Sequence, residues 1–169
     1  MKDIYVKILA DHTADVIKRT SGLTPGRVLI NECPEKLPQC ELAVRIEFGG
    51  QLPDKQSIRG YLSCGTVRLE EFRPLLSAMA RHFGLEEALL DNPEALRDLL
   101  SEFLNIVIGL TGADWSAHGF VMDFGPPTDL SGRPLPPLKA TDKAYHLTVN
   151  VPVESGPETR VDLLAVFSD

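Results

Sequence analysis

The feature that most constrains the fold of this chain is an order of elements that occurs twice. A helical pattern over residues 3–22 is followed by three strand-like runs, and a second helical pattern over residues 92–112 is followed by three more. Without gaps, "LADHTADVIKRTSGLT" aligns with "LRDLLSEFLNIVIGLT", and Gly22 falls on Gly109. The repeat predicts an α+β fold, built from an internally duplicated helix-plus-three-strands unit. Six strands would form an antiparallel sheet, with the helices packed on one face.

The predicted strands alternate apolar and polar residues, most clearly in "LAVRIEF", residues 42–48. The other predicted strands cover residues 27–32, 57–69, 118–124, 144–153 and 160–167, and the last two form a hairpin. Between the halves we expect a helix over 70–83 and further turns over 85–90. Residues 125–143 are rich in Pro and Gly and predict a surface loop. No linker divides the chain, so residues 1–169 are predicted to form a single domain.

Composition excludes some classes of function. The formal net charge of −7, without Lys/Arg clusters, argues against nucleic acid and anionic membranes as partners. No signal peptide or membrane-spanning run is visible, so we expect a cytoplasmic protein with no membrane insertion. Cys33, Cys40 and Cys64 fit no zinc spacing and are interpreted as reduced thiols. The histidines are interpreted as structural or surface residues, and no metal site is expected: His12, His82, His118 and His146.

The second helix carries a line of unusual residues. Each helical residue advances by about 100°, so the spacing of four, three and four places Asp98, Glu102, Asn105 and Gly109 on one line. Ser101 lies beside that line. The apolar residues spread over the other side and are predicted to enter the core: Leu96, Leu99, Leu100, Phe103, Val107 and Leu110.

A line of this kind is most simply a solvated polar face. Two residues favour contact with a partner instead. Asn is a poor helix former, and Gly109 costs about 1 kcal/mol relative to Ala while leaving a bare patch on the same line. Asn105 therefore belongs to an exposed strip that also carries Glu102 one turn earlier.

This segment resembles the active-site helix of the CheC/CheX/FliY chemotaxis phosphatases, most closely the CheX branch. The family's pattern is Asp/Ser-x-x-x-Glu-x-x-Asn with a Pro further along the chain. Asp98, Glu102 and Asn105 match it, and Pro126 and Pro127 lie near the expected place. The stretch "IRGYLSCGTVRLEEFRPLLSAMARHFG" also resembles the family's central strand and helix. The resemblance implies that Glu102 and Asn105 are catalytic. The supporting or partner-binding residues would be Asp98, Ser101, Gly109, Pro126 and Pro127.

The resemblance also implies a function in chemotaxis or two-component signalling. The partner would be a phosphorylated CheY-type response regulator, whose aspartyl phosphate is hydrolysed. Asn105 would orient the attacking water, as Gln does in small GTPases, and Glu102 would pair with a cation of the regulator. The regulator would supply Mg²⁺, so no cofactor of the chain's own is expected. Asp15 and Lys18 stand at the matching positions of the first helix, which we expect to be inactive.

CheX-type relatives form homodimers, and we expect the strand over residues 57–69 to pair with its own copy at a sheet edge. Two other functional classes stay open at this point. One is a noncatalytic adaptor of the same fold, binding a response regulator or a flagellar or receptor-associated protein. The other is an unrelated α+β domain that binds a small molecule and whose polar strip is only solvated.

Overall fold

The computed structural model describes residues 2–32, 39–134, 137–154 and 156–168. Its three α-helices are α1 (Lys2–Ser21), α2 (Leu69–His82) and α3 (Pro93–Ala117), and the short 3₁₀ helix η1 spans Glu87–Asp91. Its strands are β1 (Leu29–Glu32), β2 (Leu42–Gln51), β3 (Ser57–Thr66), β4 (Val121–Phe124), β5 (Thr128–Asp129), β6 (Lys143–Val151) and β7 (Thr159–Ser168).

The strands form one antiparallel sheet of seven strands with the order β1-β6-β7-β3-β2-β4, and β5 pairs with β2. The order is symmetric about the centre of the sheet, between β7 and β3. Each strand of one half has its counterpart at the mirrored position: β1 corresponds to β4, β6 to β2, and β7 to β3. The units α1-β1-β2-β3 and α3-β4-β6-β7 are therefore arranged as two equivalent halves. This order confirms the duplicated α+β fold. The sheet has seven strands instead of the predicted six, because Thr128–Asp129 in the predicted loop forms β5.

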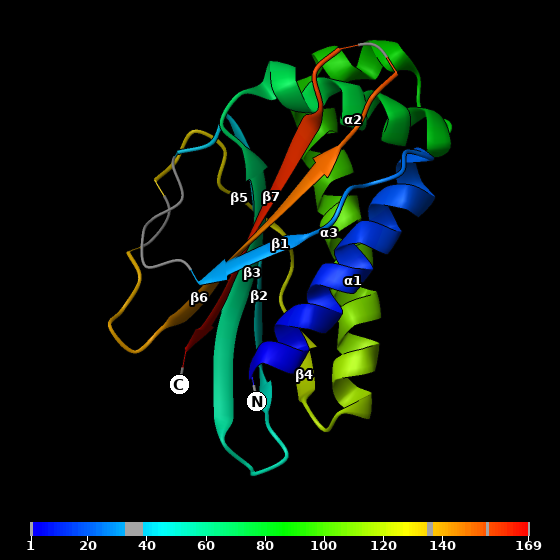
Figure 1. The fold of residues 1–169 in the computed structure, drawn as a ribbon. Coiled ribbons are helices and arrows are strands. Elements are labelled where there is room, and N and C mark those ends of the chain that lie inside the picture. The colour runs from blue at the N-terminus through cyan, green and yellow to red at the C-terminus, as the bar shows by residue number, and fades with distance from the viewer. Residues whose placement is uncertain (1, 33–38, 135–136, 155, 169) are drawn as a thin grey trace.

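The three α-helices cover one face of the sheet (Figure 1). Alternate residues of the strands meet them, as Leu42, Val44 and Ile46 of β2 do, and all three are buried. The predicted core residues of α3 pack into the same cluster, although Leu110 is only partly buried. Burying one such side chain stabilises the fold by about 1.5–3 kcal/mol, so this helix-covered layer holds most of the hydrophobic stabilisation.

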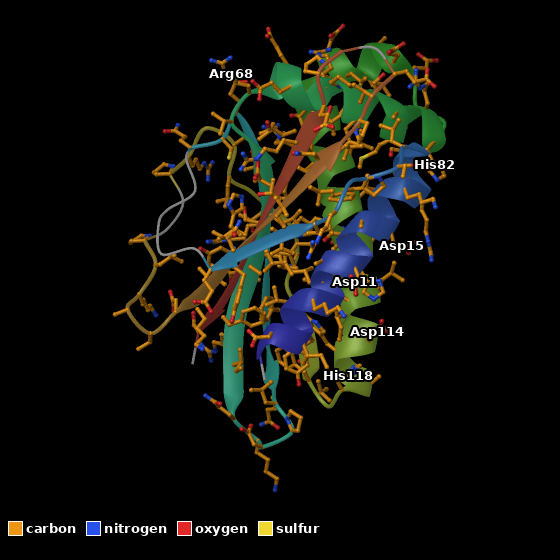
Figure 2. The ribbon with its side chains drawn as sticks, viewed as in Figure 1. Asp11, Asp15, Arg68, His82, Asp114 and His118 are labelled. Carbon is orange, nitrogen blue, oxygen red and sulfur yellow. The ribbon has the colours of Figure 1, made fainter. Side chains whose placement is uncertain are left out.

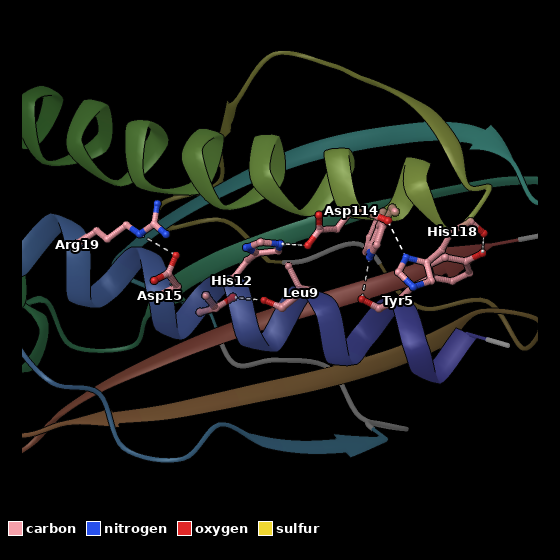
Figure 3. Close-up of polar contacts among 9 residues, drawn as sticks. Tyr5, Leu9, His12, Asp15, Arg19, Asp114 and His118 are labelled. Atoms are coloured by element: carbon pink, nitrogen blue, oxygen red, sulfur yellow. Dashed lines mark hydrogen bonds and ion pairs between the residues drawn. The ribbon is translucent and has the colours of Figure 1, made fainter.

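The two repeated helices, α1 and α3, run antiparallel and are joined near the start of α1 (Figure 3). The indole Nε1 of Trp115 donates a hydrogen bond of 2.8 Å to the carbonyl oxygen of Tyr5. The Trp115 ring also stacks on Phe120, with 5.2 Å between ring centroids. Two turns further along α1, His12 Nε2 lies 2.8 Å from Asp114 Oδ2. These contacts fix how far one helix is shifted along the other.

The prediction that the second helix ends at Gly112 is wrong. Gly112 lies inside α3, and a Cβ there would come within 2.7 Å of Cζ of Phe124. Its missing side chain therefore makes room for β4. The helix continues because the following turn buries Trp115. It ends at Ala117, two residues before Gly119, whose φ of +85° is incompatible with a continued helix. Since His118 and Gly119 end the helix, the predicted strand 118–124 begins only at Val121.

The predicted edge strand is in fact a central strand. β3 lies between β7 and β2 and is paired on both sides, so it offers no edge to a second copy. It also stops at Thr66, three residues before the predicted end, because Thr66 Oγ1 donates to the carbonyl oxygen of Arg68 in the turn that leads into α2. Within the described ranges, the free edges of the sheet belong to β1 and to β4 with β5.

None of the helices in the described part of the chain has the length and apolar character needed to cross a membrane. Cys64 is buried on the helix side of β3, and burial raises the pKa of its thiol. Cys40 packs against a second apolar cluster, on the other side of the sheet, and no disulfide links it to Cys64. Cys33 lies outside the described residues.

The contact between α1 and α3 generates a stability prediction. Trp115→Phe should lower the free energy of unfolding by about 2 kcal/mol, because the Tyr5 carbonyl loses its donor and the smaller ring leaves space. Denaturant unfolding followed by far-UV circular dichroism would measure the change. Val121→Ala is the control, since Val121 is 66% exposed and should leave the midpoint within experimental error. If Trp115→Phe unfolded at the same denaturant concentration as the wild type, the contact of Trp115 with Tyr5 would not stabilise the fold.

Candidate functional site

Helix α3 begins where the sequence predicts. Asn92 is the N-cap, and its side-chain oxygen accepts a 2.9 Å hydrogen bond from the backbone N–H of Glu94. Pro93 occupies the first helical position, where its missing N–H costs no hydrogen bond. This start fixes which residues of the helix face the core and which face outward.

The predicted strip is on the surface of the molecule. Asp98, Glu102, Asn105 and Gly109 are all exposed, and Ser101 beside them is half-buried. The opposite side of the helix is buried against the sheet and the other helices. The structure therefore brings these residues together along one accessible line.

The side chains of Glu102 and Asn105 form no hydrogen bond or ion pair with any residue that the structure describes. The two residues lie one helical turn from each other and are open to solvent, so their polar atoms can contact an approaching molecule. A carboxylate only accepts hydrogen bonds, whereas an amide both accepts and donates. Among the described residues, no three His, Cys, Asp or Glu side chains lie together in a way that could hold a metal ion.

Gly109 leaves a bare patch at the end of this line. A Cβ built on Gly109 would find no heavy atom within 4 Å, so the fold does not require glycine at this position. Gly112 differs, since Phe124 occupies the space beside it. Packing inside the chain therefore explains one of these two helical glycines and leaves the other unexplained.

A loop that carries both predicted prolines runs along one flank of the strip. At one end of this loop Phe124 contacts Gly112, and at the other Asp129 Oδ2 lies 3.1 Å from Nη1 of Arg97. The connecting residues 125–127 therefore pass the middle of α3 and run antiparallel to that helix. Pro126 is exposed and Pro127 half-buried. Ser101 lies on this flank, because it is about 20° from Gly112 around the helix.

Sequence reasoning missed the anchors of this flank. Burial alone raises the pKa of the Asp129 carboxyl, but hydrogen bonds from Ser131 and the nearby Arg97 outweigh burial and hold that pKa below its usual value. The ionised Asp129 thus fixes Arg97 of α3 to β5. No local pattern marks this pair, since the two residues are 32 positions apart in the chain.

The matching strip on α1 has a different chemistry. Asp15 Oδ2 lies 2.8 Å from Nε of Arg19, one turn later on the same helix, and Lys18 is exposed. Figure 2 labels Asp11 and Asp15 on α1, and Asp114 near the end of the neighbouring α3. The carboxylate of this half is therefore already paired within its own helix, and no amide stands beside it.

No protein-family model matches the sequence, and a search of curated protein sequences gives no match. Solved structures do match. A chemotactic CheC-like protein from Shewanella oneidensis MR-1 superposes with a TM-score of 0.73 at 18% identity, over 99% of this chain and 100% of that chain. A chain of the CheX–CheY–BeF₃–Mg²⁺ complex from Borrelia burgdorferi gives 0.72 at 16%, over 98% of both chains. FliY from Thermotoga maritima gives 0.53 at 13%, over 96% of this chain and 88% of that chain.

These matches cover nearly the whole chain, including both repeated helices and the sheet that they cover. They confirm, at the level of the fold, the resemblance that the Glu102 and Asn105 helix indicates. The duplicated architecture, with its paired helices on one face of an antiparallel sheet, is the CheC/CheX fold.

Proposed function

We propose that this chain is a phosphatase that stimulates hydrolysis of the aspartyl phosphate of a CheY-type response regulator. The observation that carries the proposal is the pair Glu102 and Asn105, which are exposed and unpaired on one line of α3 in a chain of the CheC/CheX fold. In the reaction, a water oxygen bonds to phosphorus while the bond from phosphorus to the aspartyl oxygen breaks. Inorganic phosphate and a free carboxylate result.

Asn105 is proposed to position the attacking water. Phosphoryl transfer requires mainly alignment and charge stabilisation, so a neutral amide suffices. Its oxygen accepts a hydrogen bond from the water, and its nitrogen can donate to a phosphoryl oxygen. The proton of the water leaves with the phosphate product, because an amide cannot act as a base near neutral pH.

Glu102 is proposed to bind a cationic side chain beside the regulator's phosphorylation site. One helical turn separates it from Asn105, so an ion pair at Glu102 sets the distance and direction at which Asn105 meets the phosphoryl group. Asp98, Ser101 and the segment with Pro126 and Pro127 would surround this contact. The bare surface at Gly109 would allow close approach of the regulator's backbone.

The neighbouring CheX structure contains CheY, BeF₃ and Mg²⁺, which supports a regulator as the partner of this fold. In our proposal the regulator holds the Mg²⁺ and the phosphatase contributes no cofactor. The α1 half is proposed to be inactive, because Lys18 has no acceptor for a water hydrogen and Asp15 is already paired with Arg19. One working site for each chain follows, in a cytoplasmic signalling protein.

A noncatalytic adaptor is the second candidate. A match to a chain of the FliG–FliM complex from H. pylori, with a TM-score of 0.57 at 9% identity, supports it, because that chain has a similar fold within a protein assembly. An adaptor would bind a response regulator or another signalling protein through the same strip. Turnover separates the two candidates: a phosphatase accelerates loss of phosphate from the regulator, and an adaptor binds it without changing that rate.

We also propose a homodimer, with its interface moved from β3 to β1. β1 is an edge strand whose residues are all exposed, including Leu29 at 51% and Ile30 at 41%. Pairing of this edge with its own copy would bury both side chains and satisfy backbone groups. The opposite edge, formed by β4 and β5, lies beside the strip on α3 and would remain accessible to the regulator.

The first functional prediction concerns Asn105. Asn105→Ala should slow regulator dephosphorylation about a hundredfold while leaving affinity nearly unchanged, because the water loses its orientation and the ion pair stays. The measurement is loss of phosphate from phosphorylated CheY-type regulators of the same genome. Lys18→Ala, at the matching position of α1, is the control and should keep wild-type activity. Equal activity of wild type and Asn105→Ala would exclude the proposed mechanism.

Glu102 should act through binding. Glu102→Ala should weaken the affinity for the regulator about tenfold, since it removes one charge-assisted contact. The wild-type affinity should also fall more steeply with added salt than that of the variant. Titration calorimetry at two salt concentrations would measure both effects, with the exposed Glu86→Ala as control. Identical salt dependence in the two proteins would argue against an ion pair at Glu102.

A substitution at Gly109 should change stability and regulator binding in opposite directions. Gly109→Ala should raise the free energy of unfolding by about 1 kcal/mol, because Ala favours the helix and finds open space. The same change should reduce regulator binding if the partner's backbone approaches this patch. Chemical unfolding and calorimetry on one preparation would give both values. A more stable protein with unchanged binding would show that no close approach occurs there.

The dimer is tested at β1. Light scattering at about 10 μM, a concentration at which a micromolar interface is largely formed, should give twice the chain mass. Ile30→Lys should lower the measured mass to that of one chain, since charges on an edge strand oppose pairing. Val121→Lys, on the other edge, should remain dimeric. A wild-type monomer would disprove the dimer without affecting the phosphatase proposal.

A further inference from the structure

A cavity of about 250 Å³ opens on the face of the sheet that the helices leave uncovered. Small residues of two central strands form its floor: Ala43 of β2, and Ser63 and Gly65 of β3. Gly65 is paired with Ala43 on one side and with Asp162 of β7 on the other. The space therefore exists because no bulky side chain stands beside Asp162.

One wall of the cavity is held in place by backbone hydrogen bonds. The N–H of Leu130 donates to the carbonyl of Ala43 over 2.9 Å, and the N–H of Gly132 donates to the carbonyl of Cys40 over 2.8 Å. These bonds fix the segment that carries Arg133 on the rim. The site is thus largely formed before anything binds, which lowers the entropic cost of binding.

Asp162 lines the cavity, and the donors that bind it all meet the same carboxylate oxygen, Oδ1. His146 Nε2 lies 2.6 Å from its Oδ1, Thr148 Oγ1 donates to Oδ1 over 3.2 Å, and Arg160 donates to Oδ1 through Nε over 2.9 Å. Nη2 of Arg160 also lies 2.8 Å from Oδ1 of Asp162. Within the described chain no side-chain donor reaches Oδ2.

Asp162 is ionised at neutral pH despite being mostly buried. Burial alone raises the pKa of its carboxyl, but the hydrogen bonds from His146 and Arg160 outweigh burial and hold the pKa below its usual value. A negative oxygen in a partly buried cavity is a strong acceptor for a cationic N–H donor.

Arg133 supplies the opposite charge. It lines the cavity and forms no ion pair with any residue that the structure describes. Asp129 attracts the Arg133 guanidinium without forming an ion pair, so the guanidinium can still bind a carboxylate through two parallel hydrogen bonds. Glu71 also lines the cavity, and its carboxylate lies 3.8 Å from the Arg68 guanidinium. The lining thus combines a cation at Arg133, an anionic oxygen at Asp162 and an apolar surface from Ala43 and Val67.

We propose that this cavity binds a free α-amino acid with an aliphatic side chain. The ammonium would meet Oδ2 of Asp162, the carboxylate would meet Arg133, and the side chain would lie over Ala43, Gly65 and Val67. The cavity volume of about 250 Å³ exceeds the roughly 150 Å³ of an apolar cavity that binds benzene, so a ligand of leucine's size has room.

The charges of the lining select against simpler ligands. A carboxylic acid without an amine would leave Oδ2 of Asp162 without a donor, and an amine without a carboxylate would leave Arg133 unpaired. A ligand that carries both charges meets both groups at once. The cavity lies on the face of the sheet opposite α3, so this proposal is independent of the proposed phosphatase site.

Titration calorimetry with the full chain tests the proposal. The probes are L-leucine, 4-methylpentanoate, which lacks the amine, and 3-methylbutylamine, which lacks the carboxylate. Leucine should bind in the millimolar range or tighter, and each analogue should bind about tenfold more weakly, because one charge-assisted contact is lost. No heat from leucine up to about 10 mM, or equal binding of 4-methylpentanoate and leucine, would overturn the proposal.

Variants locate the binding. Arg133→Gln, on an exposed rim position, should weaken leucine about tenfold and leave 3-methylbutylamine unchanged. Arg27→Gln is the matched control, since Arg27 is exposed and lies outside the cavity lining. Ser63→Leu should abolish binding of all three probes by filling the floor. If Arg133→Gln binds leucine like the wild type, the cavity is not the site, whatever the folding of Ser63→Leu.

Discussion

The antiparallel contact between α1 and α3 is the interaction on which the rest of the structure depends. Each helix belongs to one half of the duplicated chain, and each half alone would leave one side of its helix and sheet uncovered. Trp115 joins the halves, because its ring packs edge-to-face on Tyr5 and Phe48 of the first half and its Nε1 donates a hydrogen bond to the Tyr5 carbonyl. The helices share one core with the sheet, so a shift of either helix would disturb that core.

This contact also decides which side of α3 faces outward. With the core side fixed by Phe103, Val107 and Trp115, the line with Glu102 and Asn105 can face only solvent. On one flank of that line stands the segment between Phe124 and Asp129, held by Gly112 at one end and Arg97 at the other. A rigid helix with a fixed flank is the kind of support that a positioning mechanism requires.

The two faces of the sheet serve different physical purposes. The helix-covered face is continuous apolar packing, which stabilises the fold. On the other face, polar side chains and small residues leave a cavity around Asp162. The two halves have also diverged in chemistry, since Asp15 pairs with Arg19 on α1 while Glu102 is unpaired on α3. Duplication thus supplies a symmetric framework, and side-chain differences give its two helices different surfaces.

The sequence by itself determined the repeated order of elements, the start of α3 at Asn92 and the exposed line with Glu102 and Asn105. These features follow from local periodicity and capping, which depend on residues only a few positions apart. It did not determine the end of α3, the central place of β3 or the cavity beside Asp162. Gly112 resembles a helix end until Phe124 occupies the space beside it, and strand order depends on pairing between distant segments. Only tertiary packing decided these features, because they arise from contacts between residues far apart in the chain.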